Sequence, residues 1–372
     1  MKSPDYCSCP INTLALVSGQ ANGGSRLHRQ RGVALITVLL IVFLASVAAV
    51  SLASLQQLAI RRSAVFLHQQ QARLYTLGAE QMAIIILTRD RQKNDIDHPN
   101  EAWALLPPIL PVAGGTLTAR LSDLQGGFNL NNLWRPAPGA PVHPAAKPDA
   151  RPSDPKPANE TQKTPAPTVA TTAKAALEPA QLSVLQRLLE SLALPPELAL
   201  AIADWIDPDA EPRFPDGAED SDYAVLNPAY LAANRPFVSV SELRLVKGVD
   251  REAFAQLQPV VRALPPGTPV NVNTAPAPVL AALGKDGPKL ADVSHLLQER
   301  PGDGYQSVDA FLNAAKLTTV EAPIKALLSV NSQYFLLQAE ARVGDGRAML
   351  YSMLYRDANG VRVLRRAFGS LD

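Results

Sequence analysis

The feature that most constrains this chain is an uninterrupted apolar stretch near its N-terminus. Between Val33 and Leu55 the sequence contains no charged residue and no proline. An α-helix rises about 1.5 Å per residue, so this stretch can cross a hydrocarbon core of about 30 Å. A basic segment precedes the stretch and ends at a single glycine, Gly32. We therefore expect a membrane-spanning helix that begins immediately after Gly32.

The edge of this stretch distinguishes it from a secretory signal, in which the cleavage site follows the apolar core. The arrangement resembles the class III signal of type IV pilins and pseudopilins, which prepilin peptidase cuts after the glycine before methylating the new N-terminus. The resemblance implies cleavage between Gly32 and Val33. Val33 departs from the phenylalanine that is usual at the first mature position.

A second departure lies at the fifth mature position, where Thr37 replaces the glutamate of most pilins. A carboxylate in a membrane helix needs a partner, which in pilin filaments is thought to be the N-terminal amine of the subunit ahead. A subunit with no neighbour ahead needs no such carboxylate. Its absence is what the resemblance implies for the minor pseudopilin K of type II secretion systems, which is thought to cap the pseudopilus tip.

The composition limits the classes of function. The net charge of +1 provides no strong field to attract nucleic acid. Both cysteines, Cys7 and Cys9, lie in the expected leader, so the processed chain would have no disulfide. The histidines are scattered and no G-x-S-x-G motif is present, so we expect no enzymatic activity. The histidines are His28, His68, His98, His143 and His295.

The fold class that we expect is α+β. The helical pattern continues past the span to about Leu87 and predicts one helix of about 55 residues, with an anchor followed by a separate helix as the alternative. Strand signals at 117–124 and 127–130, and a three-stranded meander at 334–343, 347–356 and 361–367, predict one antiparallel sheet against this helix.

Between the early and the late strands lies a Pro/Ala-rich segment, followed by short helical patterns. The K pseudopilins resemble this plan: a pilin-like domain interrupted by a large all-α domain of helix-hairpin-helix, SAM-like type. The expected parts are a prepilin leader at 1–32, the transmembrane helix at 33–55, the first pilin-like part at 56–134, a disordered linker at 135–176, the inserted α-domain at 177–328 and the C-terminal meander at 329–372.

Local signals give more detailed predictions for the inserted part. Ser239 and Glu242 form a capping box that opens a helix, and a second helix is expected over 251–264. Thr274 is expected to cap the next helix. The stretches 243–250 and 270–275 look like helix-hairpin-helix modules, which bind DNA phosphates in other proteins. Basic residues near them are few, so we favour a scaffold over nucleic-acid binding.

The densest chemical feature is an acidic loop that contains one arginine, Arg213. Repulsion among so many carboxylates favours a hard cation such as Ca²⁺, although a solvated acidic loop is the alternative. The K family has an acidic calcium-binding loop after a Trp-Ile-Asp motif, and Trp205-Ile206-Asp207 matches this motif. The resemblance implies a structural Ca²⁺ ion. The ligands that we favour are Asp207, Asp209, Glu211, Glu219, Asp220 and Asp222.

Together these features predict a structural minor pseudopilin at the tip of the type II secretion pseudopilus, which nucleates assembly and limits filament growth. The resemblance implies as partners the minor pseudopilins I, J and H, prepilin peptidase and the inner-membrane assembly platform. It also implies a single inner-membrane span, with a cytoplasmic N-terminus before processing and a periplasmic bulk. The alternatives are a membrane-anchored helix-hairpin-helix DNA-binding protein of the competence type and a soluble enzyme, which the span disfavours.

Overall fold

The computed structural model describes residues 33–135, 176–285, 290–317 and 320–370. Helix α1 runs without interruption over Val33–Arg91, which confirms the single long helix and excludes a separate anchor. The chain divides into two compact units, residues 1–62 and 63–372. In the described part of the first unit, the apolar residues of α1 are exposed, and this helix is long and apolar enough to cross a membrane.

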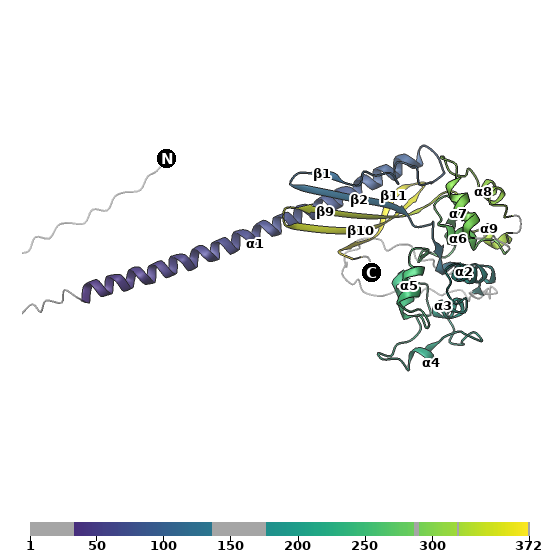
Figure 1. Cartoon of the computed structure of the whole chain (residues 1–372), viewed down its shortest axis with the longest axis horizontal. Coiled ribbons are helices and arrows are strands. Elements are labelled where there is room, and N and C mark those ends of the chain that lie inside the picture. The colour runs from purple at the N-terminus through teal and green to yellow at the C-terminus, as the bar shows by residue number, and fades with distance from the viewer. Residues whose placement is uncertain (1–32, 136–175, 286–289, 318–319, 371–372) are drawn as a thin grey trace, which may run out of the picture. The chain divides into compact units, whose positions relative to one another are not determined.

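The second unit contains a five-stranded antiparallel sheet (Figure 1). The late strands β9 (Tyr334–Val343), β10 (Gly346–Asp357) and β11 (Gly360–Phe368) form the predicted meander. The early strand β2 (Gly115–Asp123) pairs with β9, and β1 (Leu110–Val112) forms the edge beside β2. This pairing confirms that early and late strands share one sheet.

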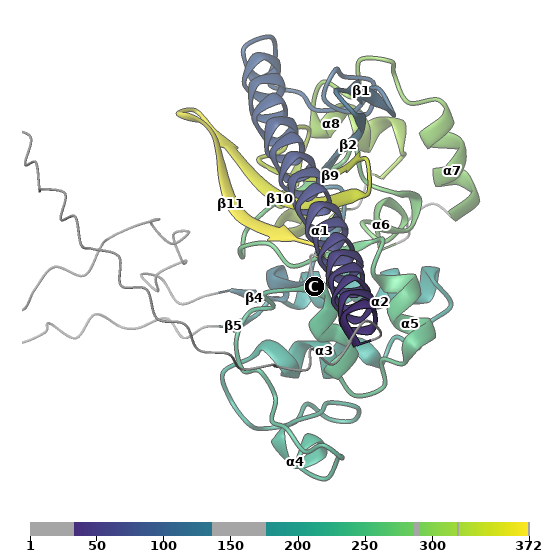
Figure 2. The ribbon, with the colours of Figure 1, turned by 90° about the vertical axis from the view of Figure 1, so that its left-hand side faces the viewer.

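The segment of α1 after Ser63 packs on one face of this sheet (Figures 1 and 2). Small residues on the helix allow close approach to larger side chains on the strands. The only acidic residues of α1, Glu80 and Asp90, are buried and bind sheet residues: Arg366 Nε donates to Glu80 at 2.9 Å, and Arg356 Nη1 to Asp90 at 2.9 Å. The core between helix and sheet includes Ala72, Ala79, Ala83, Leu87, Leu117, Leu121, Phe335, Leu337, Leu350 and Leu354.

Between β2 and β9 the chain forms a block of short helices with its own apolar core, as the fold class predicts (Figure 1). These helices are α2 (Pro179–Ser191), α3 (Leu198–Ile206), α4 (Asp220–Tyr223), η2 (Val240–Leu245), α5 (Arg251–Leu257), α6 (Ala277–Ala281), α7 (Leu290–Gln298), α8 (Val308–Ala314) and α9 (Ala322–Lys325). The 3-10 helix η1 (Leu130–Leu133) precedes them. Two-residue strand pairs join the block: β3 (Phe128–Asn129) with β6 (Val261–Arg262), β4 (Trp134–Arg135) with β5 (Ala176–Leu177), and β7 (Val270–Asn271) with β8 (Leu328–Ser329).

Several local predictions were wrong. The helix expected over 251–264 ends at Leu257, because Pro259 lacks the N–H that a helix needs and the chain then turns into β6. The strand expected at 127–130 shortens to β3, which pairs with β6 and not with the main sheet. The Ser239 capping box is confirmed, but it opens a 3-10 helix.

Thr274 does not cap α6, whose N-cap residue is Pro276. Its hydroxyl instead donates to Asp123 Oδ2 at 2.5 Å. Asp123 lies at the end of β2 and also accepts hydrogen bonds from Ser332 and Asn271, so this buried carboxylate ties the sheet to the helical block. A polar tertiary partner therefore outweighed the local capping signal.

The predicted leader, residues 1–32, lies outside the described residues. So does most of the predicted linker, whose terminal residues Arg135 and Ala176 pair with each other in the β4–β5 ladder. The domain bounds expected from the sequence stay predictions.

Candidate metal centre

The candidate metal centre forms where α3 ends. Helix α3 is made almost entirely of apolar residues and is buried on nearly all sides. Asp204, as a member of this helix, is therefore also buried. Asp207 follows as the C-cap residue, with an extended backbone that leads into the acidic loop. Glu219 returns the loop to the same place, directly before α4. All three carboxylates are buried, and an oxygen from each lies within 4.8 Å of the others.

The hydrogen bonds of these three carboxylates differ. Asp204 is saturated: its Oδ2 accepts the backbone N–H groups of Arg213 and Ala218, each at 3.0 Å. The Arg213 guanidinium also donates Nη1 to both Asp204 and Asp207. By contrast, Asp207 Oδ1 and both carboxylate oxygens of Glu219 are buried without a hydrogen-bond partner.

Gly217 permits this close arrangement. A Cβ atom at this position would lie 2.1 Å from Asp204 Oδ2 and 2.4 Å from the Arg213 backbone nitrogen. Only a residue without a side chain lets the loop fold so tightly over Asp204.

The electrostatics of the centre are unbalanced, because three buried carboxylates face one guanidinium. Burial, reinforced by the charges of Asp207 and Asp204, raises the pKa of Glu219 to about 8. Burial also raises the pKa of Asp207, against the lowering effect of Arg213. Buried carboxylate oxygens without a donor are costly, and a divalent cation relieves that cost. The donor set is all oxygen, which is the set that Ca²⁺ prefers over softer metals.

The structure brings together only part of the predicted ligand set. Asp207 and Glu219 meet, whereas Asp209 and Glu211 are exposed and Asp209 Oδ1 accepts the Glu211 N–H. Asp220 accepts the backbone N–H of Ala232 at 2.9 Å.

Asp222 pairs with Lys247 at 2.7 Å, and this lysine lowers the pKa of the carboxyl. The ligand set predicted from the sequence left out Asp204, which the structure places beside Asp207 and Glu219. It lies one helical turn before Asp207, a spacing that could have identified it.

A second acidic group, Asp90, Asp97 and Glu101, was also missed, because Asp90 and Asp97 meet Arg356 only through the fold. Arg356 Nη2 donates to both oxygens of Asp97 at 2.5 Å. Glu101 accepts the indole N–H of Trp103 at 2.8 Å. Arg356 pairs with Asp90 and Asp97, and Glu101 accepts protein hydrogen bonds, so an internal ion-pair network accounts for this group without a metal ion.

The predicted processing and filament residues lie at the start of α1. Gly32 is outside the described residues, and Val33 is the first residue of the helix. Thr37 is exposed, and its hydroxyl donates to the Ala34 carbonyl of the same helix at 2.9 Å. Its side chain therefore binds within its own helix.

The fold and these features define the class of protein. A long N-terminal helix packed on an antiparallel sheet, with an apolar half that can span a membrane, is a pilin-like arrangement, and here a helical block is inserted into it. The family profiles described as "Type II secretion system (T2SS), protein K" match residues 126–266 and 270–331.

Individual relatives support the same family. The type II secretion system protein K of Pseudomonas aeruginosa is 36% identical over 353 residues, covering 91% of this chain and 93% of that protein. The protein K of Klebsiella pneumoniae is 33% identical, covering 92% and 97%.

A solved structure is also similar. A chain in the crystal structure of the GspK-GspI-GspJ complex from enterotoxigenic Escherichia coli matches with a TM-score of 0.63 and 28% identity, covering 83% of this chain and 99% of that one. The chain described here belongs to the type II secretion system protein K family, and is thus a minor pseudopilin. This family is a structural component of a secretion system, which disfavours the competence-type and enzyme alternatives.

Proposed function

We propose that this protein occupies the tip of the pseudopilus, where it nucleates assembly and limits growth. The observation that carries the proposal is Thr37. A hydroxyl bound to its own helix offers no carboxylate to the amine of a subunit ahead, so the helix has no acceptor for a further subunit at its leading end.

The inserted block supports the same position. The sheet strands β2 and β9 are neighbours in space but are separated by the whole block of helices in the chain. A folded block of this size has its own core, and its bulk would obstruct a subunit stacked ahead of it.

The partners follow from the relatives. A similar chain was crystallised in a complex with GspI and GspJ, so we propose the corresponding minor pseudopilins I and J as direct neighbours, with H further along the filament. Prepilin peptidase would cut after Gly32, and the assembly platform would receive the processed helix. In this account α1 spans the inner membrane once and the second unit is periplasmic.

We further propose that Ca²⁺ orders the acidic loop as a structural ion. Asp207 and Glu219 have buried oxygens without hydrogen-bond partners, and Asp204 adds a third carboxylate. The exposed neighbours Asp209 and Glu211, with Asp220 and Asp222, stay candidate ligands that could complete the six to eight oxygens of a calcium shell. The ion would neutralise charge and hold the loop on α3.

Co-purification tests the position in the tip. The full chain, expressed with its cognate I and J pseudopilins and prepilin peptidase, is expected to give one ternary complex by native mass spectrometry, with the chain cut before Val33. A Thr37→Glu variant should still join I and J but should allow a further subunit to add. Failure of the processed chain to bind either partner would refute the tip position.

A further inference from the structure

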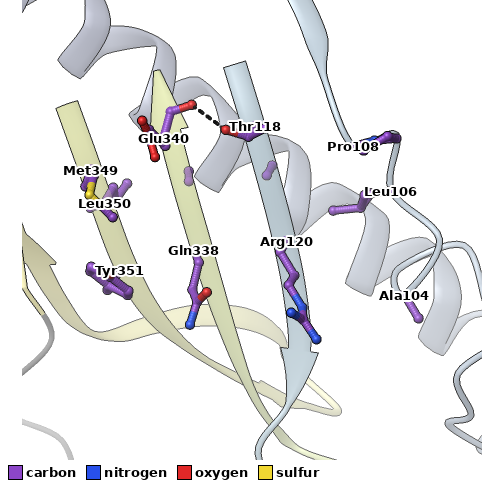
Figure 3. A pocket seen from close by; sticks show the side chains of 12 residues that line it. Ala104, Leu106, Pro108, Thr118, Arg120, Gln338, Glu340, Met349, Leu350 and Tyr351 are labelled. Atoms are coloured by element: carbon purple, nitrogen blue, oxygen red, sulfur yellow. Dashed lines mark hydrogen bonds between the residues drawn. The ribbon is translucent and has the colours of Figure 1, made fainter. Parts of the chain in front are cut away.

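The two edges of the main sheet differ in how far they are covered. At one edge, β1 pairs with the start of β2, and Leu106 and Pro108 lie beside that strand (Figure 3). At the other edge, β11 pairs with β10, and no described strand pairs with its outer side. Figure 2 shows β11 at the outer side of the sheet. In the described part of the chain, β11 is therefore an open edge strand.

The ladder with β10 defines where the backbone groups of β11 point. In an antiparallel pair, a residue points both its N–H and its C=O towards the same neighbouring strand, and the direction alternates along the strand. Gly360 closes the two-residue turn with Asp357. At the other end, the Gly369 N–H donates to the Met349 carbonyl at 3.0 Å. Both glycines therefore face β10.

Four residues of β11 point their backbone groups away from β10. The alternation runs inwards from each glycine, and one extra residue in the ladder, Leu364, separates the two stretches. The four residues are Val361, Val363, Arg366 and Phe368. No described residue forms a backbone hydrogen bond with them on this outer side. Their N–H and C=O groups can pair with another extended chain.

The side chains of these four residues share the face of the sheet that is turned towards α1. Val361 and Val363 pack at the margin of the core between α1 and the sheet. The Arg73 guanidinium of α1 lies 4.2 Å from the centroid of the Phe368 ring, and Arg366 pairs with a carboxylate of the same helix. A strand added to β11 would place the side chains of its hydrogen-bonded residues on this face. Apolar residues suit those positions, because they would lie next to the two valines.

The opposite face of β11 is basic. The strand contains three arginines and no acidic residue. Arg362, on this face, is 63% exposed and pairs with Asp357 at 4.0 Å, the long limit of an ion pair. Its guanidinium lies 4.7 Å from the centroid of the Tyr355 ring. An acidic residue therefore suits the position opposite Arg362 on an added strand, because opposite charges on neighbouring strands attract.

The charge of this edge also limits what can cover it. Two copies of β11 paired edge to edge would bring arginines close to arginines, which is destabilising. The chain's own segment at 136–175 contains ten prolines, five basic residues and three acidic residues. That composition is neither acidic nor suited to strand pairing, since proline lacks the N–H that the ladder needs. An acidic segment of another protein fits the edge better than either.

We propose that the open edge of β11 binds an extended segment of a partner protein as an additional antiparallel strand, in which apolar and acidic residues alternate. The backbone hydrogen bonds supply affinity, and the alternating side chains select the partner. Its apolar residues lie beside Val361 and Val363, and an acidic residue lies beside Arg362. The proposal does not depend on the tip position or on calcium.

The test uses the full chain in neutral detergent micelles and a fluorescein-labelled peptide, Thr-Val-Glu-Val-Glu-Val-Thr, read by fluorescence anisotropy. In the proposed pairing, the valine N–H groups of the peptide donate to β11 and the glutamate N–H groups point away. N-methylation of the central valine should therefore weaken binding about tenfold or more, whereas N-methylation of a glutamate, the matched control, should not. A twin peptide with glutamine in place of glutamate should bind about fivefold more weakly.

Two variants test the contribution of the protein. Arg362→Gln should weaken binding of the acidic peptide about two- to fivefold, the effect of one exposed charge pair. Arg120→Gln is the matched control, because it removes the same charge from the same face of the sheet, on β2 at the far side from β11. It should leave the affinity unchanged.

Hydrogen exchange read by mass spectrometry locates the bound peptide. The peptide should slow exchange in the fragment that covers 361–368 and leave the fragment that covers 115–123 unchanged. Slow exchange of the outward-facing β11 amides in the free chain would overturn the proposal, because the chain itself or a second copy would already cover this edge. Equal binding of the valine-methylated peptide, or of the glutamine twin, would also overturn it.

Discussion

Replacing Glu219 by glutamine tests the metal centre, because the structure predicts opposite effects with and without calcium. In the metal-free protein the folded-state pKa of Glu219 is about 8, against an ordinary value of 4.5. Because the pKa is higher in the folded state, the protonated Glu219 side chain makes its full contribution to the free energy of unfolding below about pH 4.5. This contribution is lost as the pH rises towards 8. At pH 7 the loss is about 1.36 × (7 − 4.5), or at most about 3 kcal/mol.

Glutamine cannot ionise, so Glu219→Gln should recover part of this loss in EDTA. With about 2 °C per kcal/mol for a unit of this size, the metal-free melting temperature should rise by up to about 6 °C. Calcium should stabilise the wild type by about 4 kcal/mol at a thousandfold excess over Kd, and the variant by much less, because one carboxylate is gone. The variant should therefore melt at a higher temperature than the wild type in EDTA, and at a lower temperature in saturating Ca²⁺.

The assay is scanning calorimetry of the full chain in micelles, with and without calcium. Glu252→Gln is the matched control, because Glu252 is exposed on α5 and should change stability by less than about 0.5 kcal/mol. A Glu219→Gln variant that melts lower in EDTA and keeps the full calcium response would show that Glu219 is a structural group and not a ligand.

Three further predictions concern the same fold. Because Glu219 is protonated at pH 7 without metal, calcium binding should release about one proton there and almost none above pH 9, and calorimetry in buffers of different ionisation enthalpy measures this release. Gly217→Ala should weaken calcium affinity at least about tenfold, since the added methyl group would collide with Asp204. Gly302→Ala is the control and should leave the affinity unchanged, because an added Cβ there has open space around it. Unchanged affinity in both variants would contradict the close packing at Gly217. Arg356→Met should cost about 3 to 5 kcal/mol in urea unfolding, because it leaves two buried carboxylates without their cation; a loss below 1 kcal/mol would refute that role.

The architecture was largely predictable because its signals are local and strong. The apolar run from Val33 leads without a proline into an amphipathic pattern, so one long helix was the simplest interpretation. The meander is marked by a glycine at each turn, and Gly360 adopts a φ of +125°, which favours glycine. The alternation of residues along β9 and β10 then fixes which face meets α1.

The local predictions that were wrong concern residues whose structure depends on contacts distant in sequence. Thr274 carries a good capping signal, but a carboxylate at Asp123, far away in the chain, takes its hydroxyl. The expected helix after Arg251 stops early, where the chain pairs with Phe128 and Asn129.

At the metal centre, too, the sequence predicts the region and the fold selects the residues. The sequence locates the acidic loop and its Trp205-Ile206-Asp207 entry, but loop carboxylates are adjacent in sequence without pointing to one place. Burial selects Asp204, Asp207 and Glu219, and it leaves Asp209 and Glu211 at the surface. The spacing of Asp204 and Asp207 could have placed these two carboxylates together, but the burial that brings Glu219 to them depends on the packing of α3 and on the close approach at Gly217, which no spacing rule encodes.

The most direct test of the tip position is the length of pseudopili in cells of the native host that overproduce the major pseudopilin. If this chain occupies the tip, deleting its gene should give long surface filaments and restoring it should give short filaments, measured by immunoelectron microscopy. The restored chain should be found only at filament ends. Equal filament lengths with and without this chain, or labelling along the shaft, would contradict the tip position.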